Sequence, residues 1–187
     1  IDDHNGKLDP AWADIRVRQA ISYAFDREGI NDSLYRGFGE ISSQPYSPGQ
    51  PEYVEGADDD YTFDLDRSME LLGEAGYPDG LDIDITIPTL TGVTTDMEPI
   101  VQQTLGELGI RVTYEPYTEI QQLIGVWSSA KYPIYIFPMP STNWVVAFDE
   151  WWGGEHGDGM VRGFQPEDTE FIALVQVMVY GGGVVLL

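Results

Sequence analysis

The chain has 187 residues, of which 32 are acidic and 9 are basic, so its formal net charge is −23. A surface of that sign repels nucleic-acid phosphates and anionic membranes, and both are excluded as expected partners. The absence of cysteine excludes disulfides, thiol catalysis and Cys-ligated metals. No run approaches the ~20 apolar residues that a membrane-spanning helix needs. The length and the 42% hydrophobic content predict one folded domain over residues 1–187.

The first helix is predicted to follow a polar, turn-rich lead-in over residues 1–13. Asp14 is placed to cap this helix, because a carboxylate accepts the free backbone N–H groups of the first turn. Apolar residues then recur at helical spacing and predict a buried face (Val17, Ala20, Ile21, Ala24 and Phe25). Gly29 is expected to end the helix, and a short helical turn through Leu34 and Tyr35 to follow it.

A long irregular loop is predicted over residues 42–61, which contain Pro45, Pro48 and Pro51. Proline fixes φ and lacks a backbone donor, which disfavours regular structure. A loop of this length inside a compact domain is often functional. The segment ends in the acidic run 58–60, which lacks the spacing of a calcium loop and is therefore expected to be solvated surface.

Residues 61–87 predict a helix, a tight turn and a strand. Asp64 can cap the helix, and one apolar face follows at helical spacing (Leu65, Met69, Leu72 and Ala75). Gly76 is expected to end the helix in a left-handed conformation. The run Leu81–Ile87 then alternates apolar with polar side chains, as a half-buried strand does.

The same alternation of helix and strand continues to residue 137. Capping boxes at residues 95–98 and 118–121 predict two helices, the first with Leu105 on its apolar face and with proline tolerated in its first turn. Strands are predicted at Ile110–Glu115, stopped by Pro116, and at Ile134–Phe137. Strands joined through helices give a largely parallel sheet, so we expect an α/β fold with all three strands in one sheet and Leu72 and Leu105 in the core. A last helix is predicted over residues 166–180, and residues 181–187 match no pattern.

The sequences of three segments resemble those of a known family. The segment from Asp64 to Gly80, D-x-x-x-S-x-E-L-L-x-E-A-G-Y-P-D-G, resembles a block of the family 5 extracellular solute-binding proteins of ABC transporters. Arg16–Ile30 resembles the block that precedes it in that family, and E-L-G-I-R-V-T-Y-E resembles the following helix-to-strand junction. The family includes peptide-, nickel- and oligosaccharide-binding receptors.

The resemblance implies a periplasmic-binding-protein-like lobe and a binding function without catalysis. Family members have two lobes that close over a solute, whereas this chain has material for about one, so we expect a second-lobe fragment whose first lobe would precede Ile1. The implied protein is exported, with its leader absent here, and acts extracellularly, at the cell surface or in the periplasm. It is expected to be monomeric, to use no cofactor and to dock onto a membrane permease.

The candidate ligand site is the loop after the third predicted strand, because open α/β sheets bind ligands outside the carboxyl ends of their strands. This loop carries hydroxyl, amide and indole groups, and further contacts are expected from nearby aromatic residues (Ser141, Thr142, Asn143, Trp144 and Trp151, with Tyr46 on the proline-rich loop). Indole faces flanked by such groups suit sugar rings. The tryptophans could equally lie in the core or at a lobe interface.

The ligand class is open between oligopeptide and oligosaccharide. Peptide-binding members of the resembled family commonly carry an aspartate in this loop, where this chain has Thr142 or Asn143 and no acid until Asp149, which favours a neutral ligand. Two other functions are considered: a ligand-sensing domain of a regulatory protein, and a secreted hydrolase with a carboxylate pair. No nucleophile elbow, phosphate loop or His-x-x-x-His motif supports catalysis, and His156 with its neighbouring acids is expected to be solvated, so no catalytic or metal-binding residue is predicted.

The charge itself generates a first testable prediction. The only lysines are Lys7 and Lys131, and acid-rich, lysine-poor surfaces are typical of proteins from salty environments. Because salt screens self-repulsion, the thermal midpoint should rise between low and high NaCl. A flat or falling series of midpoints would count against salt adaptation.

Overall fold

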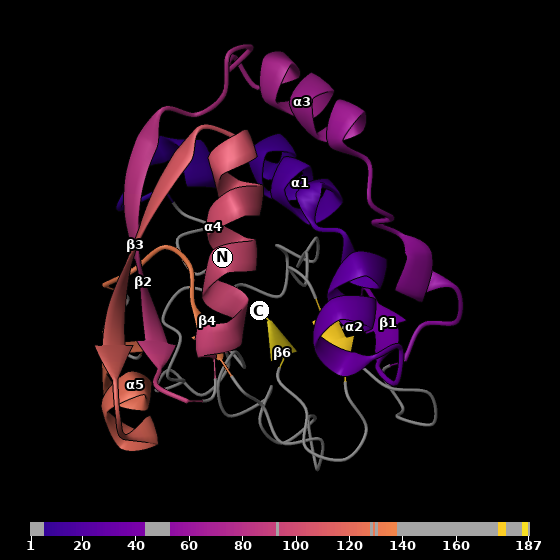
Figure 1. Ribbon diagram of the computed structural model, residues 1–187. Helices are drawn as coiled ribbons and strands as arrows, with labels where there is room; N and C mark the ends of the chain where they lie inside the picture. Colours follow the sequence, from indigo (N-terminus) through magenta and orange to yellow (C-terminus); the bar gives the residue numbers. More distant parts are fainter. Residues whose placement is uncertain are drawn as a thin grey trace.

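The structure, a computed structural model, describes residues 6–43, 53–92, 94–127, 129, 131–137, 176–178 and 185–186. Helices and strands alternate through most of this range, which confirms the α/β class (Figure 1). The elements are, in order, η1 Pro10–Ala13, α1 Ile15–Ala24, α2 Arg27–Tyr35, β1 Glu40–Ser42, η2 Ala57–Asp59, α3 Leu65–Glu74, β2 Ile83–Leu90, η3 Thr95–Met97, α4 Glu98–Glu107, β3 Ile110–Tyr117, α5 Ile120–Trp127, β4 Ile136–Phe137, β5 Gln176–Met178 and β6 Val185–Leu186. None of the helices in the described ranges has the length and apolar character required to cross a bilayer.

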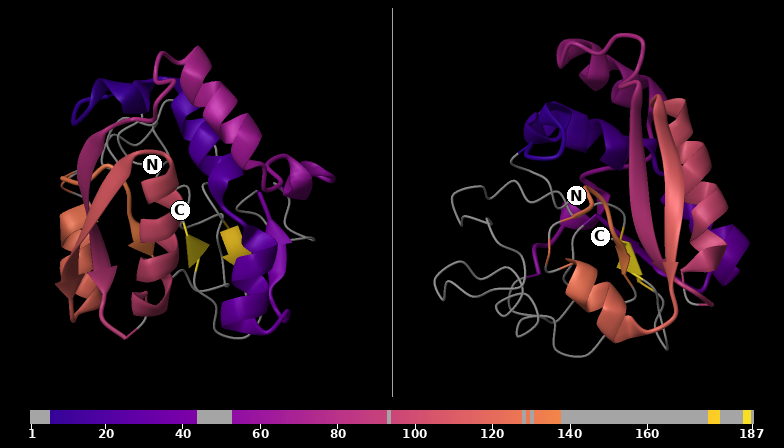
Figure 2. Two further views of the ribbon diagram at one scale, coloured as in Figure 1. Left: turned by 45° about the horizontal axis from the view of Figure 1, so that its top comes forward. Right: turned by 90° about the vertical axis from the view of Figure 1, so that its left-hand side faces the viewer.

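The parallel pair β2–β3 is the longest sheet element, with Ile83 opposite Ile110 at one end and Leu90 opposite Tyr117 at the other. Helix α4 connects the two strands and packs along β3, while α1 and α3 lie side by side at the end of the molecule where β2 begins (Figures 1 and 2). The predicted parallel relation of these two strands is therefore confirmed.

The prediction that the third strand joins the same sheet is wrong. Strand β4 lies beside β2 but forms its hydrogen-bonded ladder with β6, in antiparallel orientation. It has only two residues, and Pro133 and Pro138 on either side of it have no N–H group to donate to a ladder.

Strand β3 also runs further than predicted, through Pro116 to Tyr117. Pro116 lies opposite Thr89, and Pro88 of β2 lies opposite Glu115. Within the described residues this sheet has two strands, so each is an edge strand, where proline is tolerated.

The chain between residues 14 and 36 forms two helices rather than the one helix and short turn that we expected. Asp14 caps α1 as predicted, accepting from the backbone N–H of Arg16 at 2.9 Å. The helix ends at Ala24, however, because Asp26 starts a second helix by accepting from Gly29 N at 2.9 Å. Gly29 therefore lies inside α2, whose C-cap is Arg36 at φ 56°.

The segment before α1 is not merely a polar lead-in. It contains η1, capped by the Asp9 side chain, and the indole of Trp12 is fully buried. Burying a side chain of this size contributes on the order of 3 kcal/mol to the free energy of unfolding. Trp12 is thus a core residue that helical periodicity did not reveal.

The helix and turn of residues 61–80 form as predicted, whereas the strand that follows, β2, begins two residues later and ends three residues later than the predicted Leu81–Ile87. Asp64 accepts from Arg67 N at 2.8 Å, and Gly76 is left-handed at φ 99°. Leu72 and Leu105 are both buried, as expected. The large side chains that are almost fully buried with them come from helices and strands alike (Trp12, Val17, Ile21, Ile87, Leu108, Ile110, Leu123 and Ile136).

The capping box predicted at residues 95–98 does not form. Thr95 lies within η3, and its hydroxyl oxygen accepts from Gly92 N at 3.1 Å instead of capping α4. Pro99 does lie in the first turn of α4, as expected.

The predicted helix over residues 166–180 is wrong at its C-terminal part, because Gln176–Met178 form strand β5, antiparallel to β1. Pairing with another backbone can override a helical pattern, and the valine in this segment favours strand. Of the predicted loop 42–61, Ser42 belongs to β1 and residues 57–59 form η2, while residues 44–52 lie outside the described part.

Two glycines provide a matched test of the turn that leads into β2. Gly80 has φ 92°, and a Cβ added to it would lie 2.9 Å from the carbonyl oxygen of Leu108, whereas a Cβ on Gly73 in α3 would meet nothing within 4 Å. Gly80→Ala should lower the free energy of unfolding by about 1–3 kcal/mol. Gly73→Ala should raise it by about 0.5–1 kcal/mol, because alanine favours helix.

Urea denaturation of both variants beside the unmodified chain measures these changes. Equal stabilities for Gly80→Ala and Gly73→Ala would show that the junction does not need a left-handed residue.

Candidate functional site

The ligand residues predicted from the sequence lie outside the described part of the chain. They are Ser141, Thr142, Asn143, Trp144 and Trp151, and Tyr46 on the proline-rich loop. Their placement stays a prediction. The site that can be built from described residues is a pocket at the start of α2.

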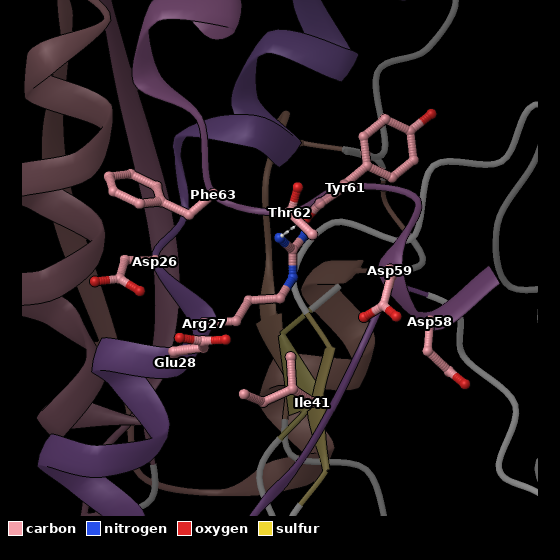
Figure 3. Close-up of a pocket in the computed structure, with 9 residues that line it drawn as sticks. All are labelled: Asp26, Arg27, Glu28, Ile41, Asp58, Asp59, Tyr61, Thr62 and Phe63. Atoms are coloured by element: carbon pink, nitrogen blue, oxygen red, sulfur yellow. Dashed lines mark hydrogen bonds between the residues drawn. The ribbon is translucent and has the colours of Figure 1, made fainter. Parts of the chain in front are cut away.

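This pocket has a volume of about 230 Å³ and is formed by three segments that are distant in the sequence (Figure 3). They are the first turn of α2, strand β1, and the chain from η2 to the start of α3. The lining residues are Asp26, Arg27, Glu28, Ile41, Asp58, Asp59, Tyr61, Thr62 and Phe63.

Arg27 is the buried cation of the pocket. It is the first residue of α2, and it is only 3% exposed. Its Nη1 donates to the carbonyl oxygens of Ser22, at 3.1 Å, and Tyr61, at 2.6 Å. Burial lowers the pKa of Arg27 to about 10, so the guanidinium still carries its charge at neutral pH.

The other edge of the same guanidinium is unsatisfied. Nε and Nη2 of Arg27 are buried without a hydrogen-bond partner, and no carboxylate in the described ranges forms an ion pair with them. A buried donor without an acceptor costs about 1–3 kcal/mol, and more when it is charged. Two adjacent guanidinium donors match the two oxygens of a carboxylate.

Carboxylates dominate the rest of the lining, but two of the four are already engaged. Asp26 caps α2, and Asp58 accepts from the hydroxyls of Ser42, at 2.5 Å, and Tyr53. The bond to Asp58 raises the pKa of Tyr53 to about 12. Glu28 and Asp59 are exposed, and they lie on opposite sides of the Arg27 side chain in Figure 3.

A second polar cluster lies at the carboxyl end of β3. Glu115 accepts from the hydroxyls of Tyr117, at 2.7 Å, and Tyr132, and Lys131 Nζ lies 3.5 Å from it. Hydrogen bonding by Tyr132 first, and then by Tyr117, lowers the pKa of Glu115. Because these groups satisfy one another, the cluster ties β3 to the segment before β4.

Neither site shows the features of a metal centre. No group of three or more His, Asp or Glu side chains within the described ranges could hold a metal ion. In the acidic run 58–60, Asp59 and Asp60 are exposed, as expected for solvated surface, whereas Asp58 is half-buried and accepts from two hydroxyls.

Sequence reasoning missed Arg27 and assigned the neighbouring charges to solvent. The sequence signal was the helical spacing of Arg27, Ile30 and Asn31, which places them on one face of α2. The structure shows that all three are buried. Arg18, on α1, donates to the carbonyl oxygens of Trp12, at 2.8 Å, and Ala13, at 3.1 Å.

Residues 3–156 match the model of the "Bacterial extracellular solute-binding proteins, family 5 Middle". This match covers more than half of the chain, which therefore belongs to the family 5 solute-binding proteins of ABC transporters.

Named relatives are similar over about half of the chain. The heme-binding protein A of Haemophilus influenzae is 31% identical over 108 residues, and the dipeptide-binding protein of Escherichia coli is 30% identical over 109 residues. Each alignment covers 54% of this chain and 20% of the relative. The chain thus spans about a fifth of the length of these relatives.

Solved structures agree with the fold. DppA of Helicobacter pylori in complex with the peptide STSA is 26% identical, with a TM-score of 0.58 over 66% of this chain and 23% of that chain. AgaA of A. tumefaciens R10 in complex with agropinic acid is 21% identical, with a TM-score of 0.65 over 80% of this chain and 31% of that chain, a likeness of fold alone.

The Glu115 cluster yields a pH prediction. Since the pKa of Glu115 is lowered in the folded chain, its contribution to stability is present above the ordinary pKa of glutamate and is lost as pH falls through the lowered value. Tyr132→Phe should move the pKa of Glu115 back toward its ordinary value, and by more than Tyr117→Phe does. Carboxyl-carbon NMR titration of the three proteins measures this difference, and an unchanged pKa in both variants would refute the assigned cause.

Proposed function

We propose that this chain is part of the solute-binding component of an ABC importer, and that the complete protein captures an oligopeptide between two lobes and delivers it to a membrane permease. The observation that carries the proposal is the family match over residues 3–156. The parallel pair β2–β3, with its connecting helix α4, supports it as the framework of one lobe.

The choice of a peptide as the solute rests on the relatives. Two of them are named as the dipeptide-binding protein of E. coli and the oligopeptide-binding protein AppA of Bacillus subtilis, the latter 31% identical over 114 residues. AppA of B. subtilis also has a solved structure in complex with a nonapeptide, at 26% identity and a TM-score of 0.53. The absence of an acid at Thr142 and Asn143 keeps an oligosaccharide as the second candidate.

The loop after β4 is the proposed ligand contact of this lobe. Ser141, Thr142, Asn143 and Trp144 would supply hydroxyl, amide and indole groups, with Trp151 and Tyr46 beside them. The other lobe would supply the opposing contacts, and closure would be a hinge motion that presents the loaded form to the permease. The protein would act outside the cytoplasm and without catalysis, because its family is one of extracellular binding proteins. A monomeric state remains an expectation from the sequence.

Isothermal titration calorimetry on the full-length protein tests the solute class. A panel of di- to nonapeptides should give heats of binding, whereas neutral oligosaccharides of similar size should give none. Binding of the oligosaccharides alone would replace the peptide with the second candidate. If cells that make the full-length protein and its transporter took up no solute, the proposed function would be overturned.

A substitution tests the proposed contact surface. Trp144→Ala should weaken binding by about 1–3 kcal/mol, roughly ten- to a hundredfold in affinity, because it removes a stacking surface. Trp144→Phe retains an aromatic face and should lose less. Thermal melts serve as the control, because unchanged affinity together with a large loss of stability would mean that Trp144 belongs to the core.

A further inference from the structure

The unsatisfied edge of Arg27 is the unusual feature of the described structure. The guanidinium is held in place by two backbone carbonyls, those of Ser22 and Tyr61, which both accept from Nη1. Nε and Nη2 are left buried without an acceptor. A charged donor pair that is fixed in position and has no partner is prepared to receive two oxygens of a carboxylate.

The rest of the lining argues against a simple anion. Among the described lining residues, four carboxylates stand against one guanidinium, so this lining is negative and repels a lone anion. A lone cation would be attracted by Glu28 and Asp59 but would leave the donors of Arg27 unpaired. A molecule that carries both charges satisfies both groups.

We propose that this pocket binds the zwitterion of a small α-amino acid, with its carboxylate on the Nε and Nη2 edge of Arg27 and its ammonium group between Glu28 and Asp59. Those two acids lie on opposite sides of the Arg27 side chain (Figure 3) and, unlike Asp26 and Asp58, accept no hydrogen bond from the described residues that would compete with an ammonium group. The pocket volume of about 230 Å³ suits this class. A pocket of this volume holds several water molecules, the size of one amino acid rather than of a long peptide.

The surroundings of Arg27 give such a ligand both access and shape. Thr62 and Phe63 are exposed lining residues, and exposed side chains change rotamer readily, so the ligand would reach the buried edge of Arg27 by displacing lining side chains of this kind. Ile41 supplies an apolar wall for a short side chain such as a methyl group. The inference rests on this pocket alone and does not depend on which solute the proposed receptor carries.

NMR titration of the 187-residue chain with L-alanine tests the inference directly. Alanine should shift the Nε–H resonance of Arg27 and the amide signals of residues 26–28 and 58–63. Acetate, which offers only the carboxylate, and methylamine, which offers only the ammonium group, should each bind at least about tenfold more weakly than alanine, because each loses one set of charged hydrogen bonds.

Substitutions separate binding from folding. Arg27→Lys keeps the charge but loses the two-donor edge, and Glu28→Gln changes an exposed residue that the core does not need, so Glu28→Gln keeps the test valid if Arg27→Lys fails to fold. Each folded variant should weaken alanine binding by about tenfold or more. Asp79→Asn, an exposed acid remote from the lining residues, is the matched control and should leave binding unchanged.

Three results would overturn the inference. They are an Arg27 Nε–H resonance that does not respond to alanine, acetate binding as tight as alanine binding, and equal effects of Glu28→Gln and Asp79→Asn.

Discussion

The close approach of two backbone turns sets the frame of the described structure. Leu81 N donates to the carbonyl oxygen of Leu108 at 2.9 Å, and Ile83 N donates to that of Gly109 at 3.3 Å, just where β2 and β3 begin. Side chains would not fit there, because a Cβ on Gly80 or on Gly109 would meet backbone atoms of the other turn at about 3 Å. These contacts set the strand register, which starts with Ile83 opposite Ile110. The register in turn determines which residues lie at the carboxyl ends of the two strands.

Around that frame, the core joins several elements between η1 and β4. Leu72 of α3 and Leu105 of α4 are buried together with Trp12, which lies before the first α-helix. Ser68 of α3 donates from its hydroxyl to the carbonyl oxygen of Ala20 in α1 at 2.6 Å, so the contact between these two helices has a polar bond within an apolar interface. The blocks that mark the family therefore correspond to packed units, since α1, α3 and the β2–β3 pair all contribute to one core.

The start of α2 differs from this apolar core because it buries a charged side chain, Arg27. An aliphatic side chain at position 27 would satisfy burial, but the arginine there binds two backbone carbonyls from segments on either side of it and leaves three of its five N–H donors unused. Buried charges of this kind rarely contribute net stability, so their presence calls for a role in positioning or binding. Here the guanidinium fixes the chain at Tyr61 beside α2, and the pocket that results is lined by charges of both signs.

Local features of this protein could be determined from its sequence, and they are the ones that depend on near neighbours. The caps at Asp14 and Asp64, the left-handed Gly76 and the alternation in β2 each involve residues within about five positions, so spacing alone predicted them. The break between α1 and α2 also depends on near neighbours, but the sequence was consistent with two different helix ends. The prediction ended the helix at Gly29, whereas in the structure Asp26 caps a new helix that contains Gly29. The ligand residues predicted after β4 lie outside the described residues and remain predictions.

Tertiary structure alone decided the features that depend on distant partners. Strand β4 pairs with β6 rather than with the parallel pair, and residues 176–178 form a strand because β1 offers them a backbone to pair with. Arg27 is buried because the chain at Tyr61, 34 residues away, closes over it. Periodicity along the chain indicates which side of a helix or strand is apolar. Which residues pack against that side depends on the path of the rest of the chain, and local sequence patterns do not contain this information.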